Sequence, residues 1–253
     1  MIENQYFNQQ NQRVFNPHLA DKNQALDQYF KLSKLSLFCD MLNQKRVLAS
    51  EYDYSWPRSP FADNPPIEEN NVLRVYQTLF ELLAKSSVDD LLFKTYNESL
   101  PILRNQISAI ELIRLYYFSI NYCLYEINRG KREYASALLE IYQNGLKNGN
   151  LLIAGELSPW IFKNMVKLGL GLRQFPWVEN IIQNYSNKLP SSQQKDAYAF
   201  NMADLAYHQK DYEYALTYLN QVDFKDPFYK HGAKTILLKI YFEKQESEAF
   251  LAL

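Results

Sequence analysis

Apolar side chains recur at intervals of three and four residues along most of this chain, which is the spacing of one face of a helix. The pattern begins at Asp21 and predicts a long helix that ends near Ser50. Helical spacing returns over Val72–Leu83, from Ser87 to about Asn97, over Ile107–Asn128 and over Tyr134–Leu146. Ser158 followed by Pro159 marks another helix start, after which helices alternate with short turns. Helices joined by short turns pack as antiparallel neighbours, so the pattern predicts an all-α protein.

Two stretches of the chain lack this helical spacing. Residues 1–18 show no usable periodicity and are predicted to form a mobile N-terminal arm. Residues 51–66, EYDYSWPRSPFADNPP, hold four of the ten prolines and are predicted to form an aromatic and proline-rich loop. The expected organisation is therefore the arm, an irregular helical region over 19–150 that contains the loop, and a more regular region over 151–253.

Composition agrees with a helical fold and narrows the classes of function. Gly and Pro are scarce, at 7 and 10 of 253 residues, while Leu, Asn and Gln are abundant. The formal net charge of −1 gives no electrostatic reason to bind nucleic acid or an anionic membrane. No apolar run is long enough to span a bilayer, and the polar start MIENQYFNQQNQ differs from a secretory signal, so a cytoplasmic location is predicted.

Self-similarity is the strongest signal in the sequence, and residues 199–227 form its clearest unit. Small residues at Ala203 and Ala215 allow two helices to approach closely, while larger residues around them fill the groove between the helices. The spacing recurs downstream, where Ala249 follows Ala215 by 34 residues. These observations predict a repeated pair of helices.

The unit resembles the tetratricopeptide repeat, with Lys210 in the turn where that family usually has Gly. The resemblance is clear over 196–227, moderate over 158–253, weak over 107–150 and not detectable before about residue 107. It implies antiparallel helix pairs stacked as a tetratricopeptide-like right-handed α-solenoid, with a less regular helical N-terminal half. A plain irregular helical bundle is the alternative, and the recurrence after 34 residues argues against it.

The resemblance also implies that the first helix of each repeat lines a concave surface. The candidate partner-binding residues on that surface are Lys163, Asn164, Lys167, Phe200, Asp204, Tyr207, His208, Lys234 and Tyr241. A surface of mixed aromatic and cationic side chains suits an extended peptide segment, and the alternative is that the rings only fill grooves between helices.

Chaperone-binding members of the family hold a terminal carboxylate with Lys and Asn. Phe200 and Asp204 stand at those places in the clear repeat, and an acid there would repel a carboxylate. Lys163 and Asn164 retain a small version of the clamp in the weaker repeat.

No pattern typical of catalysis or metal binding occurs in the sequence. The three histidines have no paired spacing, no glycine-rich phosphate loop is present, and the two cysteines, Cys39 and Cys123, are far apart inside apolar helical patterns. We expect these cysteines to be buried free thiols, with a single disulfide as the alternative. The sequence thus predicts no cofactor, no metal and no catalytic residue. The leading hypothesis is a non-enzymatic scaffold that binds another protein or a peptide segment.

A second candidate surface lies in the 51–66 loop, where Tyr54, Trp56 and Arg58 are residue types common at binding hot spots. The alternative function is a helical enzyme or small-ligand sensor with a pocket near this loop. The chain also stops soon after Ala249, and its last residues, SEAFLAL, are apolar to the end. Because repeat arrays need a polar terminal cap, we expect either a longer protein or self-association through this C-terminal helix.

Overall fold

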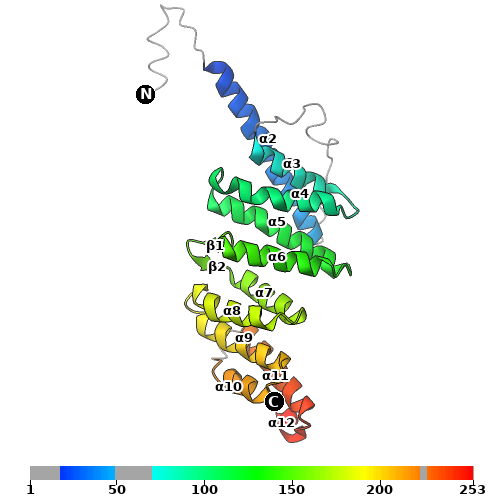
Figure 1. Ribbon diagram of the computed structural model, residues 1–253, viewed down its shortest axis with the longest axis vertical. Coiled ribbons are helices and arrows are strands. Elements are labelled where there is room, and N and C mark those ends of the chain that lie inside the picture. The colour runs from blue at the N-terminus through cyan, green and yellow to red at the C-terminus, as the bar shows by residue number, and fades with distance from the viewer. Residues whose placement is uncertain (1–17, 49–69, 223–226, 253) are drawn as a thin grey trace, which may run out of the picture. The chain divides into compact units, whose positions relative to one another are not determined.

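The computed structural model describes residues 18–48, 70–222 and 227–252, and these are helical apart from turns and one short strand pair (Figure 1). The α-helices are α2 (Leu19–Leu48), α3 (Asn71–Ala84), α4 (Asp90–Ser99), α5 (Ala109–Asn128), α6 (Tyr134–Lys147), α7 (Pro159–Gly171), α8 (Phe175–Tyr185), α9 (Gln194–His208), α10 (Tyr212–Leu219), α11 (Pro227–Glu243) and α12 (Ser247–Ala252). Two 3-10 helices, η1 (Leu100–Asn105) and η2 (Ser186–Lys188), follow α4 and α8. Strands β1 (Leu152–Ile153) and β2 (Glu156–Leu157) pair antiparallel. The all-α prediction is confirmed, and the predicted arm before residue 18 and the 51–66 loop lie outside the described residues.

Side-chain caps explain where several helices begin. The Oγ of Ser108 accepts a hydrogen bond from the backbone N of Glu111 at 3.2 Å, which satisfies one of the free N–H groups of α5. Ser87 precedes Asp90 with the spacing of a capping box, which predicts that Ser87 starts this helix, but this is wrong, because Asp89 is the capping residue. Its carboxylate accepts from the backbone N of Leu92 at 2.9 Å. Asp89 is two residues closer to the helix than Ser87, and its ionised carboxylate also complements the positive end of the helix dipole.

The chain divides into two compact units, residues 1–107 and 108–253, which are described separately. The boundary that the sequence pattern places at residue 150 stays a prediction, because compactness and sequence repeats divide a chain by different criteria.

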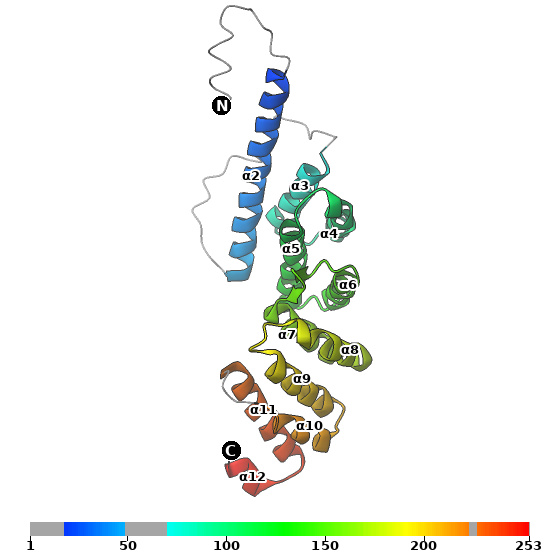
Figure 2. The same cartoon turned by 90° about the vertical axis from the view of Figure 1, so that its left-hand side faces the viewer.

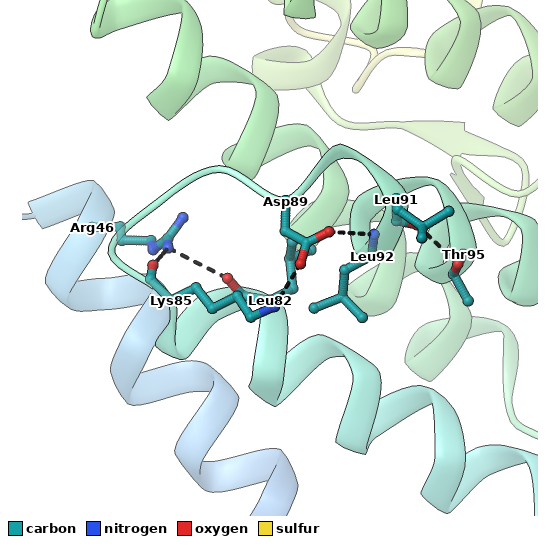
Figure 3. Close-up of polar contacts among 7 residues, drawn as sticks. All are labelled: Arg46, Leu82, Lys85, Asp89, Leu91, Leu92 and Thr95. Atoms are coloured by element: carbon teal, nitrogen blue, oxygen red, sulfur yellow. Dashed lines mark hydrogen bonds and ion pairs between the residues drawn. The ribbon is translucent and has the colours of Figure 1, made fainter.

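In the first unit, α2 and α3 pack side by side and run in the same direction. The Cys39 thiol donates to the backbone O of Tyr76 at 3.7 Å. Seven residues later, Arg46 Nη2 donates to the backbone O of Lys85 at 2.8 Å and lies 3.5 Å from the backbone O of Leu82 (Figure 3). Contacts that advance together along both helices define a parallel pair.

Arg46 and Asp89 fasten the two ends of the α3–α4 corner (Figure 3). The guanidinium of Arg46 satisfies carbonyl groups that the last turn of α3 leaves free. Lys85 Nζ lies 2.5 Å from Asp89 Oδ2, and this contact, together with the N–H of Leu92, lowers the pKa of the Asp89 carboxyl. Thr95 Oγ1 donates to the backbone O of Leu91 within α4.

In the second unit, consecutive helices pack as antiparallel pairs: α5 with α6, α7 with α8, α9 with α10, and α11 with α12 (Figure 2). Each pair also contacts the next, through α6 and α7, α8 and α9, and α9 and α11. Ala203 and Ala215 are fully buried between α9 and α10, as the sequence predicts. Gly169 plays the same part between α7 and α8, because a Cβ at that position would lie 2.4 Å from a methyl of Val178.

The same turn joins the two helices of every pair in this unit. One residue of each turn has a left-handed backbone, and these residues are Gly130 (φ 93°), Arg173 (φ 56°), Lys210 (φ 66°) and Gln245 (φ 61°). In the α9–α10 turn, Asp211 N donates to Ala206 O at 2.9 Å and Lys210 N donates to Tyr207 O at 3.0 Å. The other three turns have the equivalent two bonds, which is the Schellman arrangement. Lys210 therefore adopts a left-handed conformation that glycine adopts without steric cost.

Both cysteines are buried and free, which confirms the prediction. Within the described ranges, no helix is long and apolar enough to cross a membrane.

Candidate functional site

Most of the predicted residues of the clear repeat gather at the C-terminal end of α9. Asp204, Tyr207 and His208 are three and four residues apart and therefore share one face of this helix. Helix α11 packs against the same helix and adds Lys239 and Glu243. We call this group the α9–α11 cluster, and it comprises Asp204, Tyr207, His208, Lys210, Tyr212, Lys239 and Glu243.

Glu243 is the acceptor at the centre of the α9–α11 cluster. The Tyr207 hydroxyl donates to Glu243 Oε1 at 2.5 Å, Lys210 Nζ donates to Oε2 at 2.6 Å, and the Tyr212 hydroxyl donates to Oε2. These donors, Lys210 first, lower the pKa of Glu243 to about 2. The hydrogen bond to Glu243 is in turn the main reason that the pKa of Tyr207 rises to about 12. The carboxylate therefore joins α9, the turn, α10 and α11.

Asp204 and His208 form the second contact of the cluster. His208 Nδ1 lies 3.3 Å from Asp204 Oδ1 and 2.8 Å from the backbone O of the same residue. The Asp204 side chain raises the pKa of His208, against the opposing effects of burial and of the Lys239 ammonium. Asp204 therefore has an intramolecular partner, which reduces the repulsion of carboxylates that the sequence predicts at this place.

Lys239 supplies positive charge on the open side of the cluster. Its Nζ lies 5.5 Å from the centroid of the Tyr207 ring, close enough for a cation–π interaction. Among the described residues, no carboxylate lies within ion-pair distance of this ammonium. Lys239 and Glu243 are not among the residues that the sequence pattern indicates. The signal that could have found Glu243 is its distance of 36 residues from Tyr207, about one repeat length.

Phe200 lies in the packing between α9 and α11, so the groove-filling alternative describes it better than an open binding face. Its ring centroid is 5.5 Å from that of Tyr229, and only 9% of its surface is exposed. Gly232 makes this possible, because a Cβ there would lie 2.6 Å from the Phe200 ring. Phe200 thus sets the distance between two first helices.

The predicted residues of the weaker repeat lie together on α7. Lys163 and Lys167 are one turn apart, and partial burial of Lys163, with the charge of Lys167 as the second cause, lowers the pKa of Lys163. Lys167 is exposed, and within the described part of the chain no acidic group forms an ion pair with it. The side-chain amide nitrogen of Asn164 is buried and has no hydrogen-bond partner among these residues.

The remaining candidates are spread more widely. Lys234 is exposed and Tyr241 half-exposed on α11. Tyr54, Trp56 and Arg58 lie outside the described residues, as does the pocket proposed near their loop for the alternative function. In the part of the chain that the structure describes, no three His, Cys, Asp or Glu side chains are grouped so that they could hold a metal ion.

Comparison with known proteins adds no family to this geometry. No protein-family model, no curated protein and no solved structure matches the chain.

Proposed function

We propose that this protein is a non-enzymatic helical-repeat scaffold, similar to the tetratricopeptide family, that binds a segment of another protein along its first helices. The repeated turns support the repeat part of this proposal. Four helix pairs end their first helix in the same left-handed turn, and the turn residues follow one another at intervals of 43, 37 and 35 residues. The last two intervals are close to the 34-residue repeat length, which favours a repeat array over an irregular bundle in the C-terminal part of the chain.

The observation that carries the binding part is the exposed positive charge of Lys167 on α7 and Lys239 on α11, neither of which forms an ion pair with a described residue. Lys163 and Lys167 repel each other on α7, and Lys239 lies over an aromatic ring on α11. Two like charges one turn apart destabilise a helix slightly, and an incoming carboxylate removes that cost. Ammonium groups beside aromatic rings bind acidic peptides through charge-assisted hydrogen bonds and apolar contact. We therefore propose an acidic segment with interspersed apolar residues as the ligand.

The test uses a fluorescein-labelled peptide of alternating Glu and Leu residues, with a peptide in which Lys replaces every Glu as its counterpart. Fluorescence anisotropy should show that the protein binds the acidic peptide, with an affinity that falls as salt rises, and does not bind the basic one. Substituting both Lys163→Met and Lys167→Met should weaken binding about tenfold or more, given about 1.4 kcal/mol for each factor of ten.

The matched control is Lys188→Met with Lys195→Met, which removes the same net charge from two other exposed positions. If the two double variants lose affinity equally, the effect belongs to net charge and the assignment of the surface to α7 is wrong. If the wild type binds neither peptide, the proposed ligand class is wrong.

A further inference from the structure

Helix α2 carries an exposed apolar stripe that packing against α3 does not use. Six large apolar or aromatic side chains on this helix have more than half of their surface exposed. Tyr29 (70%) lies to one side, and the other five lie along one face: Leu19 (53%), Leu26 (64%), Phe30 (56%), Leu37 (56%) and Leu48 (69%). Exposed apolar side chains that line up on one face of a helix are a candidate interaction surface.

The spacing of the stripe keeps it on one line along the helix. Its positions follow two series of eleven residues, Leu19–Phe30–Met41 and Leu26–Leu37–Leu48. Eleven residues are close to three full helical turns, so residues at this spacing remain on the same face over the whole length of α2. At 100° per residue, the buried side chains of Leu35 and Cys39, which face α3, lie on the opposite side of the helix. Helix α2 is therefore apolar on two opposite faces, and α3 covers one of them.

We propose that the exposed stripe of α2 binds the same stripe of a second copy of this chain. In an antiparallel pair that crosses between residues 31 and 32, Leu26 lies opposite Leu37 of the second copy, and Leu19 lies within one helical turn of its Met41. In a parallel pair, each stripe residue lies opposite its own counterpart. The stripe extends over the 30 residues of α2, about 45 Å, which is long enough for four heptads of helix pairing.

Charge beside the stripe favours a second copy as the occupant. Asp27 and Lys34 lie on one flank of the stripe, and an antiparallel pair places each opposite the other. Lys22 lies on the other flank, where it faces Asp40 of the second copy in an antiparallel pair and Asp27 in a parallel pair. The stripe is thus complementary to itself in charge as well as in apolar surface, a property that an unrelated partner does not require.

Position 30 has a local contact that is compatible with this pairing. Lys34 Nζ lies 4.6 Å from the centroid of the Phe30 ring, which leaves most of the ring surface open. The Lys34 ammonium remains at the edge of the stripe, where it can reach an acidic side chain of the second copy.

Light scattering coupled to size-exclusion chromatography tests the inference with the full chain. The wild type should be a dimer at about 50 μM, and Leu26→Glu combined with Leu37→Glu should make it a monomer. Both side chains are exposed, so the variant should keep the circular dichroism spectrum of the wild type. A separate single substitution, Lys34→Glu, should weaken the dimer more at low salt than at high salt.

Leu91→Glu is the matched control, because Leu91 of α4 lies in the same unit and is 75% exposed. It should leave the dimer intact. A wild type that is monomeric at this concentration overturns the inference, and so does a dimer that survives the two Glu substitutions. A dimer that Leu91→Glu dissociates equally well also assigns the interface to another surface. None of these outcomes depends on peptide binding by α7.

Discussion

Glu243 shows at the scale of a single residue how packing creates chemistry that composition does not reveal. Its carboxylate is solvent-accessible, yet it accepts hydrogen bonds from Tyr207, Lys210 and Tyr212, which come from α9, a turn and α10. These donors stabilise the ionised form, so the pKa of Glu243 falls from 4.5 to about 2. An apolar side chain at this position would leave these three donors without their common acceptor.

The shift predicts how stability depends on pH. A carboxyl group whose pKa is lower in the folded state contributes stability that is complete above its unfolded pKa and is lost as the pH falls towards its folded pKa. Between pH 5 and pH 2.5, the unfolding midpoint of the wild type should therefore fall more steeply than that of Glu243→Gln. Thermal melts at several pH values measure this difference.

Glu248→Gln is the control for this experiment, because Glu248 is exposed on α12 and has no hydrogen-bond partner among the described residues. Its melting profile should parallel that of the wild type. Equal slopes for wild type and Glu243→Gln would contradict the assigned role of the carboxylate.

At the scale of elements, the recurring turn has more importance than any one helix. It requires a left-handed residue after the first helix of each pair, and only Gly130 supplies one without steric cost. Arg173, Lys210 and Gln245 adopt the same conformation because the two Schellman hydrogen bonds and the packing of the following helix hold them there. The contact of the Lys210 ammonium with Glu243 offsets part of the strain of the left-handed backbone at Lys210.

Replacing Arg173 with Gly should therefore stabilise the second unit. Arg173 is exposed, and glycine removes the clash of Cβ with the backbone at φ 56°, which should raise the unfolding free energy by about 0.5–1 kcal/mol after the entropy cost of Gly. Chemical denaturation measures the change. Arg173→Ala serves as the control, because Ala retains the Cβ and should not raise the unfolding free energy. If Ala raises it as much as Gly does, the strain comes from the Arg side chain rather than from the backbone.

At the scale of the whole molecule, short helices and close contacts between chain neighbours dominate the described residues. Strands are limited there to the two-residue pair of β1 and β2. Helices α2 and α3 are the main departure from antiparallel packing of chain neighbours among the described residues, because these two helices are parallel.

Far-UV circular dichroism of the full chain should accordingly show a predominantly helical spectrum. Sheet content should be negligible, since the strand pair is too short to contribute. A sheet content above about a fifth, the average level of globular proteins, would contradict the fold. Deconvolution of the spectrum at native pH is the measurement.

Much of the helical structure follows from local sequence alone. Of the helices predicted over 21–50, 72–83, 107–128 and 134–146, each begins and ends within two residues of its predicted bounds. Periodicity of 3.6 residues and caps such as Ser108 act over one or two turns, so no distant contact is needed to read them. The cap of α4 shows the limit, because Ser87 and Asp89 both suit the role and Lys85 favours Asp89.

The candidate site depended on tertiary structure to a much greater extent. The sequence by itself determined that Asp204, Tyr207 and His208 share one face of α9, since helical spacing alone places them there. Only the packing of α9 against α11 decided that Glu243 and Lys239 join them, and that Phe200 turns into the interface opened by Gly232. The physical reason is distance along the chain. Helix formation is governed by neighbours within four residues, whereas these contacts join residues more than 30 positions apart. They also depend on a turn in which Lys210 is left-handed, a conformation that the intrinsic preference of lysine does not predict.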